Sequence, residues 1–299
     1  MTGCPEGIRH SAMLIVVGYI IVLAATLGGF MIAGGHPAVL MHVSEFVVIG
    51  GIAMGLLVIA SPKKVLTNTL HATMVALRGN LPARADYLDM FKVLYELFMT
   101  GKKSGLIALD EHVSSPETSP VFLKYPGFLK HKARLDFLCN GLKPIIDGKI
   151  KPDQLQPLLE AEIETREEEG HGPITVLSLV GDSLPGIGIV AAVLGIINTM
   201  AAIADGPEAV GERVAAALTG TFLGVLGAYG FVNPLTNRIK FNEEAETKYF
   251  SCMAAAIAAF ARGLAPIMAI EIARRNLDAS LAPGSEELEQ MLKAALSGR

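Results

Sequence analysis

Residues with catalytic potential are sparse in this chain, and their spacing does not build a known catalytic arrangement. Gly186, Gly188 and Ala191 fit a GxGxxA pattern, but they lie inside an apolar run, whereas a dinucleotide-binding turn follows a strand. The tetrapeptide GKKS at 101–104 is similar to the end of a phosphate-binding loop, but Glu96 occupies the upstream glycine position. Because HExxH, GxSxG and CxxC motifs are also absent from the sequence, we expect no enzymatic activity.

Histidines and cysteines do not predict a metal site either. His36 and His42 lie in or beside one short connection between apolar runs, and we interpret them as surface residues. Cys4, Cys139 and Cys252 are too far apart for a disulfide framework or a paired zinc motif. The formal net charge of −4 gives no basic surface for nucleic acid. We therefore expect no metal, no organic cofactor and no nucleic-acid partner.

The charged residues themselves are clustered, and the stretches between the clusters predict membrane spans. Only 18% of residues are charged, compared with about 25% in an average soluble domain. Asp, Glu, Lys and Arg are absent from apolar runs at 13–35, 46–62, 185–204 and 214–237. A hydrocarbon core of ~30 Å needs about 20 helical residues. The sequence therefore predicts four transmembrane helices, of which the second is the shortest.

Basic residues predict the orientation of these helices. Of the 25 Lys and Arg residues, all except Arg213 lie before the first span, between the second and third spans, or after the fourth. Lys63, Lys64, Arg238 and Lys240 flank span ends directly, where the positive-inside rule is strongest. We therefore expect both termini in the cytoplasm and the four spans surrounded by membrane lipid.

The predicted fold is all-α: a polytopic membrane protein with four transmembrane helices, a large helical cytoplasmic insert between spans 2 and 3, and a helical cytoplasmic C-terminal tail. Residues 252–273 of the tail are interrupted by charges and proline, which favours an amphipathic cytoplasmic helix; attachment to the membrane surface is the alternative. The expected parts are an unstructured N-terminal extension (1–12, with Met13 as an alternative start), a first transmembrane hairpin (13–62), the insert (63–173), a second hairpin (174–237) and the tail (238–299).

Small residues mark the second hairpin as a packing surface. Gly220, Gly224 and Ala228 recur every four residues and predict a smooth helix face for close helix packing. No Asp, Glu, Lys, Arg or His occupies the centre of a span, so a protein that moves ions would need the titrating group from a partner. Pro185 and Pro234 lie at the predicted cytoplasmic ends of spans 3 and 4, where each marks either a hinge or a simple helix end.

The apolar runs also carry specific motifs. The segments MLIVVGYIIVLAATLGGFMIAGG (13–35), LVGDSLPGIGIVAAVLG (179–195) and TGTFLGVLGAYGFVNPL (219–235) resemble the MotA family of flagellar motor stator subunits, within the MotA/TolQ/ExbB proton-channel group. The resemblance covers about residues 13–275, and the four-span layout distinguishes it from three-span TolQ and ExbB.

The resemblance implies a homopentamer around MotB, whose transmembrane helices occupy the central pore and supply the ion-carrying Asp. Ion flow, of protons by the LVGDSLP context with sodium as the alternative, would rotate the pentamer and exert torque on the rotor protein FliG. Two other functions remain open: a TolQ/ExbB-like energy transducer, and a transporter permease component whose insert docks an ATPase.

Family positions transfer onto individual residues of this chain. Pro185 and Pro234 match the two functional prolines, and Thr221 and Ala192 match positions that face the ion pathway. Three rotor-contact charges fall on Lys102 (Arg in many relatives), Asp110 (Glu in many relatives) and Glu162. Since charge sign is kept while Arg and Lys differ in hydrogen-bond geometry, we expect the rotor contact to tolerate a point charge.

Overall fold

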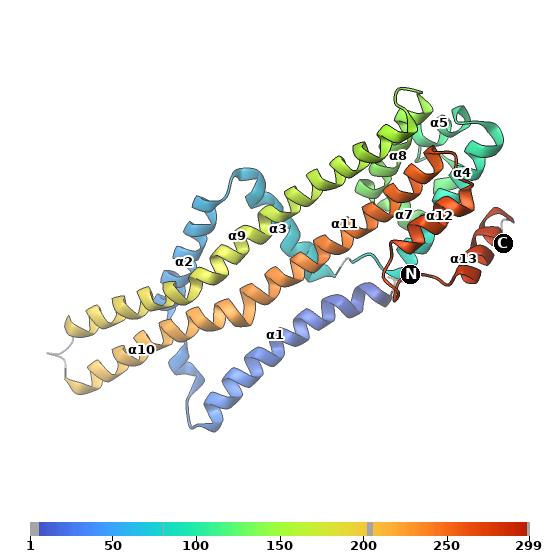
Figure 1. The fold of residues 1–299 in the computed structure, drawn as a ribbon. Coiled ribbons are helices and arrows are strands. Elements are labelled where there is room, and N and C mark those ends of the chain that lie inside the picture. The colour runs from blue at the N-terminus through green and yellow to red at the C-terminus, as the bar shows by residue number, and fades with distance from the viewer. Residues whose placement is uncertain (1–5, 80, 202–205, 298–299) are drawn as a thin grey trace. The chain divides into compact units, whose positions relative to one another are not determined.

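The computed structural model describes residues 6–79, 81–201 and 206–297, and every regular element in this part of the chain is a helix (Figure 1). The chain divides into two compact units. A membrane unit contains residues 1–80 and 169–242, and a second unit contains residues 81–168 and 243–299. Two long helical stretches belong to both units, so each unit is built from segments that are distant in the sequence.

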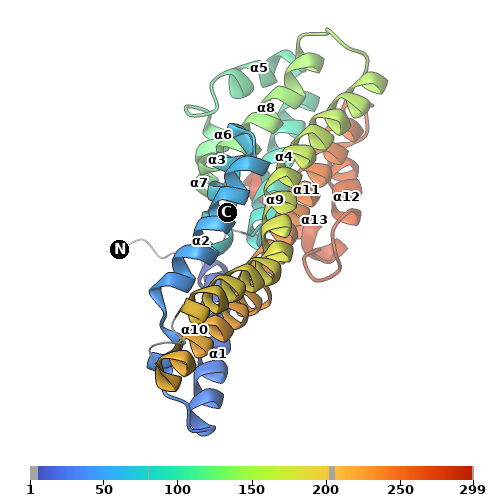
Figure 2. The same cartoon turned by 90° about the vertical axis from the view of Figure 1, so that its left-hand side faces the viewer.

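The membrane unit contains four helices that are long and apolar enough to cross a membrane, which confirms the predicted all-α, four-span class. Its elements in chain order are α1 (Glu6–Ile32), η1 (Pro37–Leu40), α2 (Val43–Ala60), α3 (Lys63–Arg78), the second part of α9 (Pro152–Ala201), α10 (Pro207–Leu226), the π-helical turn η3 (Gly227–Val232) and the start of α11 (Asn233–Ala261). Figures 1 and 2 show α9 and α10 running side by side, with α2 in contact with α10.

The helix boundaries correct three expectations. The first helix begins at Glu6, inside the extension predicted to be unstructured, because no helix breaker separates residues 6–12 from the apolar run. The third span does not begin at a helix end: α9 is a single helix of 50 residues that continues through Pro185. The fourth span likewise continues through η3 into α11, so Pro234 is also internal to a long helical segment.

The second unit is a helical core around α4 (Arg84–Ser104). The remaining elements are α5 (Ile107–Ser114), α6 (Pro120–Leu123), α7 (Pro126–Lys130), α8 (Lys132–Ile146), the first part of α9, the rest of α11, α12 (Pro266–Arg275) and α13 (Ser285–Ser297). Helices α5, α6, α7, α12 and α13 all contact α4. As a result residues 93–98 are all buried, and α4 is the central helix of this unit.

The segment 252–273 is also part of this core. Cys252, Met253 and Ile257 are buried on α11, and Ala269 and Ile270 are buried on α12. A turn between the two helices contains Gly263, whose φ of +87° lies in the left-handed region that favours glycine. Its apolar side chains pack inside the second unit, and the segment consists of the end of α11 and most of α12 instead of the single amphipathic helix that the sequence predicts.

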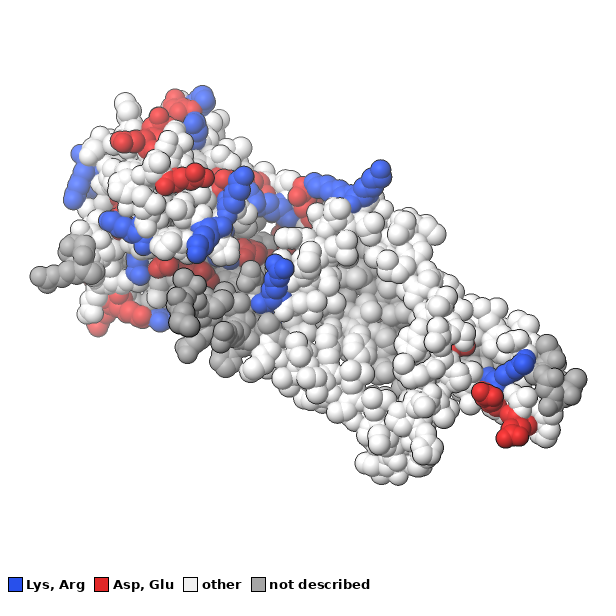
Figure 3. All heavy atoms as spheres, turned by 180° about the vertical axis from the view of Figure 1, so that it is seen from behind, with Lys and Arg blue, Asp and Glu red and all other residues white. Residues whose placement is uncertain are grey.

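Charge follows the same division. In the view of Figure 3 most acidic and basic side chains gather on the second unit, whereas the surface of the membrane helices is almost entirely uncharged. Many large apolar side chains of the membrane helices remain exposed, among them Ile20, Ile59 and Ile197. An exposed apolar surface of this extent indicates contact with lipid or with other helices.

Candidate functional site

Helices α9 and α10 approach each other closely because glycines face each other across their interface. An ideal Cβ at Gly224 would lie 2.6 Å from the backbone oxygen of Leu184 and 2.8 Å from Cα of Gly188. An ideal Cβ at Gly188 would lie 2.9 Å from the backbone oxygen of Gly220. The predicted packing residues Gly220, Gly224 and Ala228 are all buried. This smooth face is therefore used inside the chain and is not left free for a partner.

The two predicted ion-pathway residues lie at this interface. Ala192 is buried on α9, and its backbone nitrogen is 3.3 Å from the position of a Cβ at Gly220. Thr221 follows Gly220 on α10 and is half-buried, and its Cα is 3.2 Å from the position of a Cβ at Gly188. The structure thus places Ala192 and Thr221 on facing helices, about one helical turn apart in height.

The two predicted hinge prolines lie near each other in the fold. Pro185 cannot donate to the carbonyl of Gly181, four residues earlier in α9. Gly181 in turn faces Asn233, the residue before Pro234: a Cβ at position 181 would overlap the Asn233 side-chain oxygen. Helix α9 at Pro185 and helix α11 at Pro234 therefore each lack a backbone hydrogen bond close to the contact between Gly181 and Asn233. This contact requires glycine at position 181, because a larger residue would overlap Asn233.

The π turn η3 accommodates the missing backbone hydrogen bond at Pro234. Pro234 has no N–H for the carbonyl of Gly230 and its ring crowds that carbonyl, which an α-helix accommodates poorly. A π-helical turn directly before it widens the helix locally. The Thr236 hydroxyl donates to the Val232 carbonyl at 2.9 Å, which satisfies one further acceptor there. The sequence predicted Pro234 at the end of the fourth span, whereas the structure places it inside a continuous helical segment after a π turn that the sequence did not reveal.

A carboxyl group that the sequence reasoning did not single out lies in the same unit. Glu45 falls in the first turn of α2, and its exposed fraction is 5%. The charge-free run begins at residue 46, directly after Glu45, so the predicted second span excludes Glu45. In the structure α2 begins at Val43, so Glu45 belongs to the helix. His42, expected at the surface, is half-buried, and its Nε2 atom has no hydrogen-bond partner among the described residues.

In the second unit, the predicted charges Lys102 and Asp110 flank the turn from α4 to α5. Lys102 is exposed in the last turn of α4, and Asp110 is half-buried on α5, where the Ser114 hydroxyl donates to it at 2.9 Å. Gly105 has a φ of +85° and forms the turn. The GKKS tetrapeptide thus ends an α-helix and does not form a phosphate-binding loop.

Glu162 lies elsewhere in this unit, on the first part of α9. It accepts a hydrogen bond from Arg166 at 2.8 Å, one helical turn away. The Arg166 guanidinium lies 4.9 Å from the ring centroid of Phe250 and 5.7 Å from that of Phe137. Glu162 is therefore part of a local ion pair that covers core aromatic rings, and the structure does not bring it together with Lys102 or Asp110.

Two buried polar clusters that the sequence did not reveal hold the second unit together. Arg134 donates two hydrogen bonds to Glu246, and its guanidinium lies 4.2 Å from the ring centroid of Tyr249. Burial opposes the charge of Arg134, but the bonded carboxylate outweighs this effect and raises the pKa of Arg134. In the second cluster, burial and the hydrogen bond to Glu96 raise the pKa of Tyr125.

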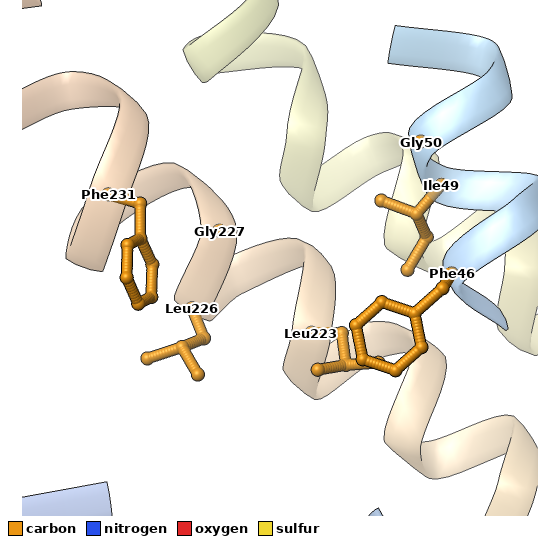
Figure 4. A pocket seen from close by; sticks show the side chains of 7 residues that line it. All are labelled: Phe46, Ile49, Gly50, Leu223, Leu226, Gly227 and Phe231. Atoms are coloured by element: carbon orange, nitrogen blue, oxygen red, sulfur yellow. The ribbon is translucent and has the colours of Figure 1, made fainter. Parts of the chain in front are cut away.

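The membrane unit also contains apolar grooves. One groove, of about 260 Å³, lies between α2 and the α10–η3 segment and is lined by the seven residues labelled in Figure 4. Phe46 and Leu223 approach each other at one end of this groove, and Phe231 stands at the other. Its lining offers no charged side chain, so it suits an aliphatic chain or an apolar helix face. The described residues contain no cluster of His, Cys, Asp and Glu that could hold a metal ion.

Comparison with known sequences identifies relatives along almost the whole chain. Residues 16–105 match the motility protein A N-terminal family, and residues 130–251 match the MotA/TolQ/ExbB proton channel family. The chain is 35% identical to motility protein A of Salmonella typhimurium over 283 residues, which cover 94% of this chain and 96% of that protein. It is 32% identical to chemotaxis protein LafT of Vibrio parahaemolyticus over 276 residues, 92% of this chain and 97% of LafT.

Two solved structures share the fold. The structure of C. jejuni MotAB superposes with a TM-score of 0.75, covering 89% of this chain and 96% of that one. The flagellar MotAB stator complex from Bacillus subtilis gives 0.70, covering 92% of this chain and 98% of that one. Each is 21% identical to this sequence. Since the sequence relatives reach 35% identity over nearly the full length and both family matches lie within it, this chain belongs to the motility protein A family.

Proposed function

We propose that this chain is the stator subunit of a bacterial flagellar motor, in which ion flow across the inner membrane drives rotation. The observation that carries the proposal is the 35% identity to motility protein A over 94% of the chain. In this proposal five copies surround two MotB helices, the ion-carrying carboxylate comes from MotB, and the coupling ion is the proton. The assembled pentamer exerts torque on FliG.

The membrane unit supports a role in assembly with other helices. The glycine face of α10 packs on α9, while large apolar residues elsewhere on α9 remain exposed, including Ile189, Val193 and Ile197. These side chains can contact neighbouring subunits, the MotB helices or lipid. The family resemblance supports the proton as the coupling ion. The distribution of basic residues supports a cytoplasmic position for both termini.

The exposed corner of the second unit supports a role in contacting the rotor. Lys102 and Lys103 are exposed at the end of α4, and Asp110 lies on the following helix. Opposite charges presented on one corner suit a partner surface that also carries both signs. Glu162 is not part of this corner: it lies on α9, where it forms an ion pair with Arg166.

The alternative functions have less support. The energy-transducing relatives TolQ and ExbB are named in the family match at 130–251. The separate match at 16–105 covers the first hairpin and the start of the insert, and its description is specific to motility protein A. No feature of the described residues favours a permease that docks an ATPase.

A gene deletion tests the proposal. We expect a clean deletion strain to assemble flagella that do not rotate, and the intact gene on a plasmid to restore swimming. In the same strain, Pro185→Leu should abolish swimming while membrane levels of the protein stay unchanged, because the interruption in α9 is removed. Normal swimming of the deletion strain, in the absence of a second stator set, would contradict the stator function.

Pro207→Leu is the matched control. Pro207 occupies the first turn of α10, where the missing N–H would have no helical acceptor in any case. This variant should swim like the wild type. Loss of swimming in both proline variants would mean that any such change disturbs the membrane unit, and wild-type swimming of Pro185→Leu would refute the hinge role.

A further inference from the structure

The carboxyl group of Glu45 lacks part of its hydrogen bonding although it is buried. Its exposed fraction is 5%, and its Oε2 atom has no hydrogen-bond partner in the described part of the chain. Glu96 in the other unit is buried to the same 5%, but Tyr125 and Lys124 donate to its two oxygens at 2.7 and 2.6 Å. An unpaired buried carboxyl oxygen is therefore not a general feature of this protein.

The recess that receives Glu45 is made of small residues at the α9–α10 interface. An ideal Cβ at Gly220 would lie 2.7 Å from Oε2 of Glu45, 3.1 Å from Cβ of Ala191 and 3.3 Å from the backbone nitrogen of Ala192. The carboxyl group thus reaches α10 only because residue 220 has no side chain. The backbone of Ala192 lines the same Cβ position, and Thr221 is the next residue of α10.

Among the described residues, one other titratable side chain acts on Glu45. It is His42, which lies directly before α2 and whose Nε2 atom is buried without a hydrogen-bond partner among the described residues. At the recess α9 and α10 contribute Ala191, Ala192 and Gly220, which do not titrate. The nearest charged residue of α10, Arg213, is seven positions away, about 10 Å along the helix axis.

These surroundings favour a proton as the ligand. An ionised carboxylate that is desolvated without partners is so costly that such a group binds a proton instead. A metal cation would need several oxygen ligands at once, and the described residues form no group of three or more His, Cys, Asp and Glu side chains here or elsewhere. Ionisable residues inside a membrane are expensive and commonly belong to an ion pathway.

We propose that Glu45 is a proton-binding site of the membrane unit, which takes up and releases a proton beside Ala192 and Thr221. On release the O–H bond at Oε2 breaks and leaves a carboxylate, and the proton passes to the aqueous side next to His42. The site adds a second exchangeable proton position to the pathway. This role in ion flow rests on the proposed stator function, whereas the binding of the proton does not.

Infrared spectroscopy of the full chain in lipid bilayers tests proton binding directly. Near neutral pH the wild-type protein should have the carbonyl stretching band of a protonated carboxylic acid in apolar surroundings. This band should be lost at high pH, and Glu45→Gln should lack it at every pH. The titration of the wild type needs no variant, so the test holds even if Glu45→Gln folds poorly. Absence of the band from the wild-type protein would overturn the proposal.

The matched control is Glu208→Gln. Glu208 is exposed in the first turn of α10, in the same unit. Its side chain is exposed to solvent and does not enter the α9–α10 interface, so the control variant should keep the infrared band. If Glu208→Gln also loses the band, the signal does not come from Glu45 and the assignment is wrong.

Swimming assays then test uptake and release. Expressed with its partner protein in the deletion strain, Glu45→Gln should rotate flagella more slowly than the wild-type protein and lose part of the dependence of speed on external pH. Glu208→Gln should match the wild type. If the band is present but Glu45→Gln swims like the wild type at every pH, the proton is purely structural and the relay role fails. If the wild-type gene does not restore swimming, the stator function fails instead, and the infrared result stands.

Discussion

Substitution of Gly224 by alanine should loosen the contact between α9 and α10. The added Cβ would lie 2.6 Å from the backbone oxygen of Leu184, and 2.8 and 3.0 Å from Cα and the nitrogen of Gly188. All three are backbone atoms, so no side-chain rotation can relieve the overlap. An ordinary contact begins near 3.4 Å, and restoring it requires the helices to separate locally by roughly 0.8 Å.

The magnitude follows from this separation. A gap of about 0.5–1 Å forfeits roughly a quarter to a half of the dispersion energy of the atoms that line it. Overpacking a well-packed interface by one methyl group costs about 1–3 kcal/mol. We expect Gly224→Ala to lower the free energy of unfolding of the membrane unit by an amount in this range. Unfolding of the purified full chain in mixed detergent micelles, followed by loss of helical circular dichroism, measures it.

Two other glycines provide controls. Gly186 on α9 has no atom within 4 Å of an added Cβ, and at Gly227 the nearest atom is the flexible Leu184 Cδ1 at 3.6 Å. Gly186→Ala and Gly227→Ala should therefore leave stability unchanged or increase it slightly, as alanine favours helices. If Gly224→Ala is as stable as these two variants, close backbone approach does not hold α9 against α10, and the packing argument is refuted.

Two further predictions concern the second unit. Glu246→Gln should destabilise the full chain by about 3–5 kcal/mol in chemical denaturation, because it leaves the charge of Arg134, 3% exposed, without its carboxylate; a cost below that of an exposed ion pair would contradict this. The hydrogen bond from Arg274 lowers the pKa of Glu271 to about 2 from its ordinary value near 4.5. Its contribution to stability should be present above pH 4.5 and lost as the pH falls toward 2. Melting curves of the wild type and Glu271→Gln should therefore converge over this range, and a difference that persists at the acid end would refute it.

The four spans could be predicted from sequence because a charge-free apolar run of about 20 residues is the length that a helix needs to cross a bilayer, and helices buried in soluble proteins rarely reach it. Their boundaries could not. A charge-free run ends at any carboxylate, so the predicted span excluded Glu45, although glycine at position 220 lets this side chain enter the helix interface. The length of α9 was missed for a related reason: a proline inside a membrane helix is tolerated when neighbours satisfy the freed carbonyl.

The candidate site was predictable only in part. The period of α4 predicts a buried face, but it cannot reveal that other helices cover the remaining faces too. Lys102 and Asp110 read as ordinary surface charges, and the family resemblance alone singled them out. The pairing of Arg134 with Glu246 joins residues 112 positions apart. Local patterns carry no information about contacts of this range.

The π turn at residues 227–232 separates two requirements that a uniform α-helix would tie together. Each residue of an α-helix turns the face by about 100°, and a π turn accommodates one extra residue. Before the turn, Gly220 and Gly224 must point at α9; after it, Asn233 must meet Gly181. The extra residue lets Gly220 and Gly224 before the turn, and Asn233 after it, all face α9. Deletion of one residue within the turn would rotate one of these two groups away from α9, so one of the two contacts would be lost.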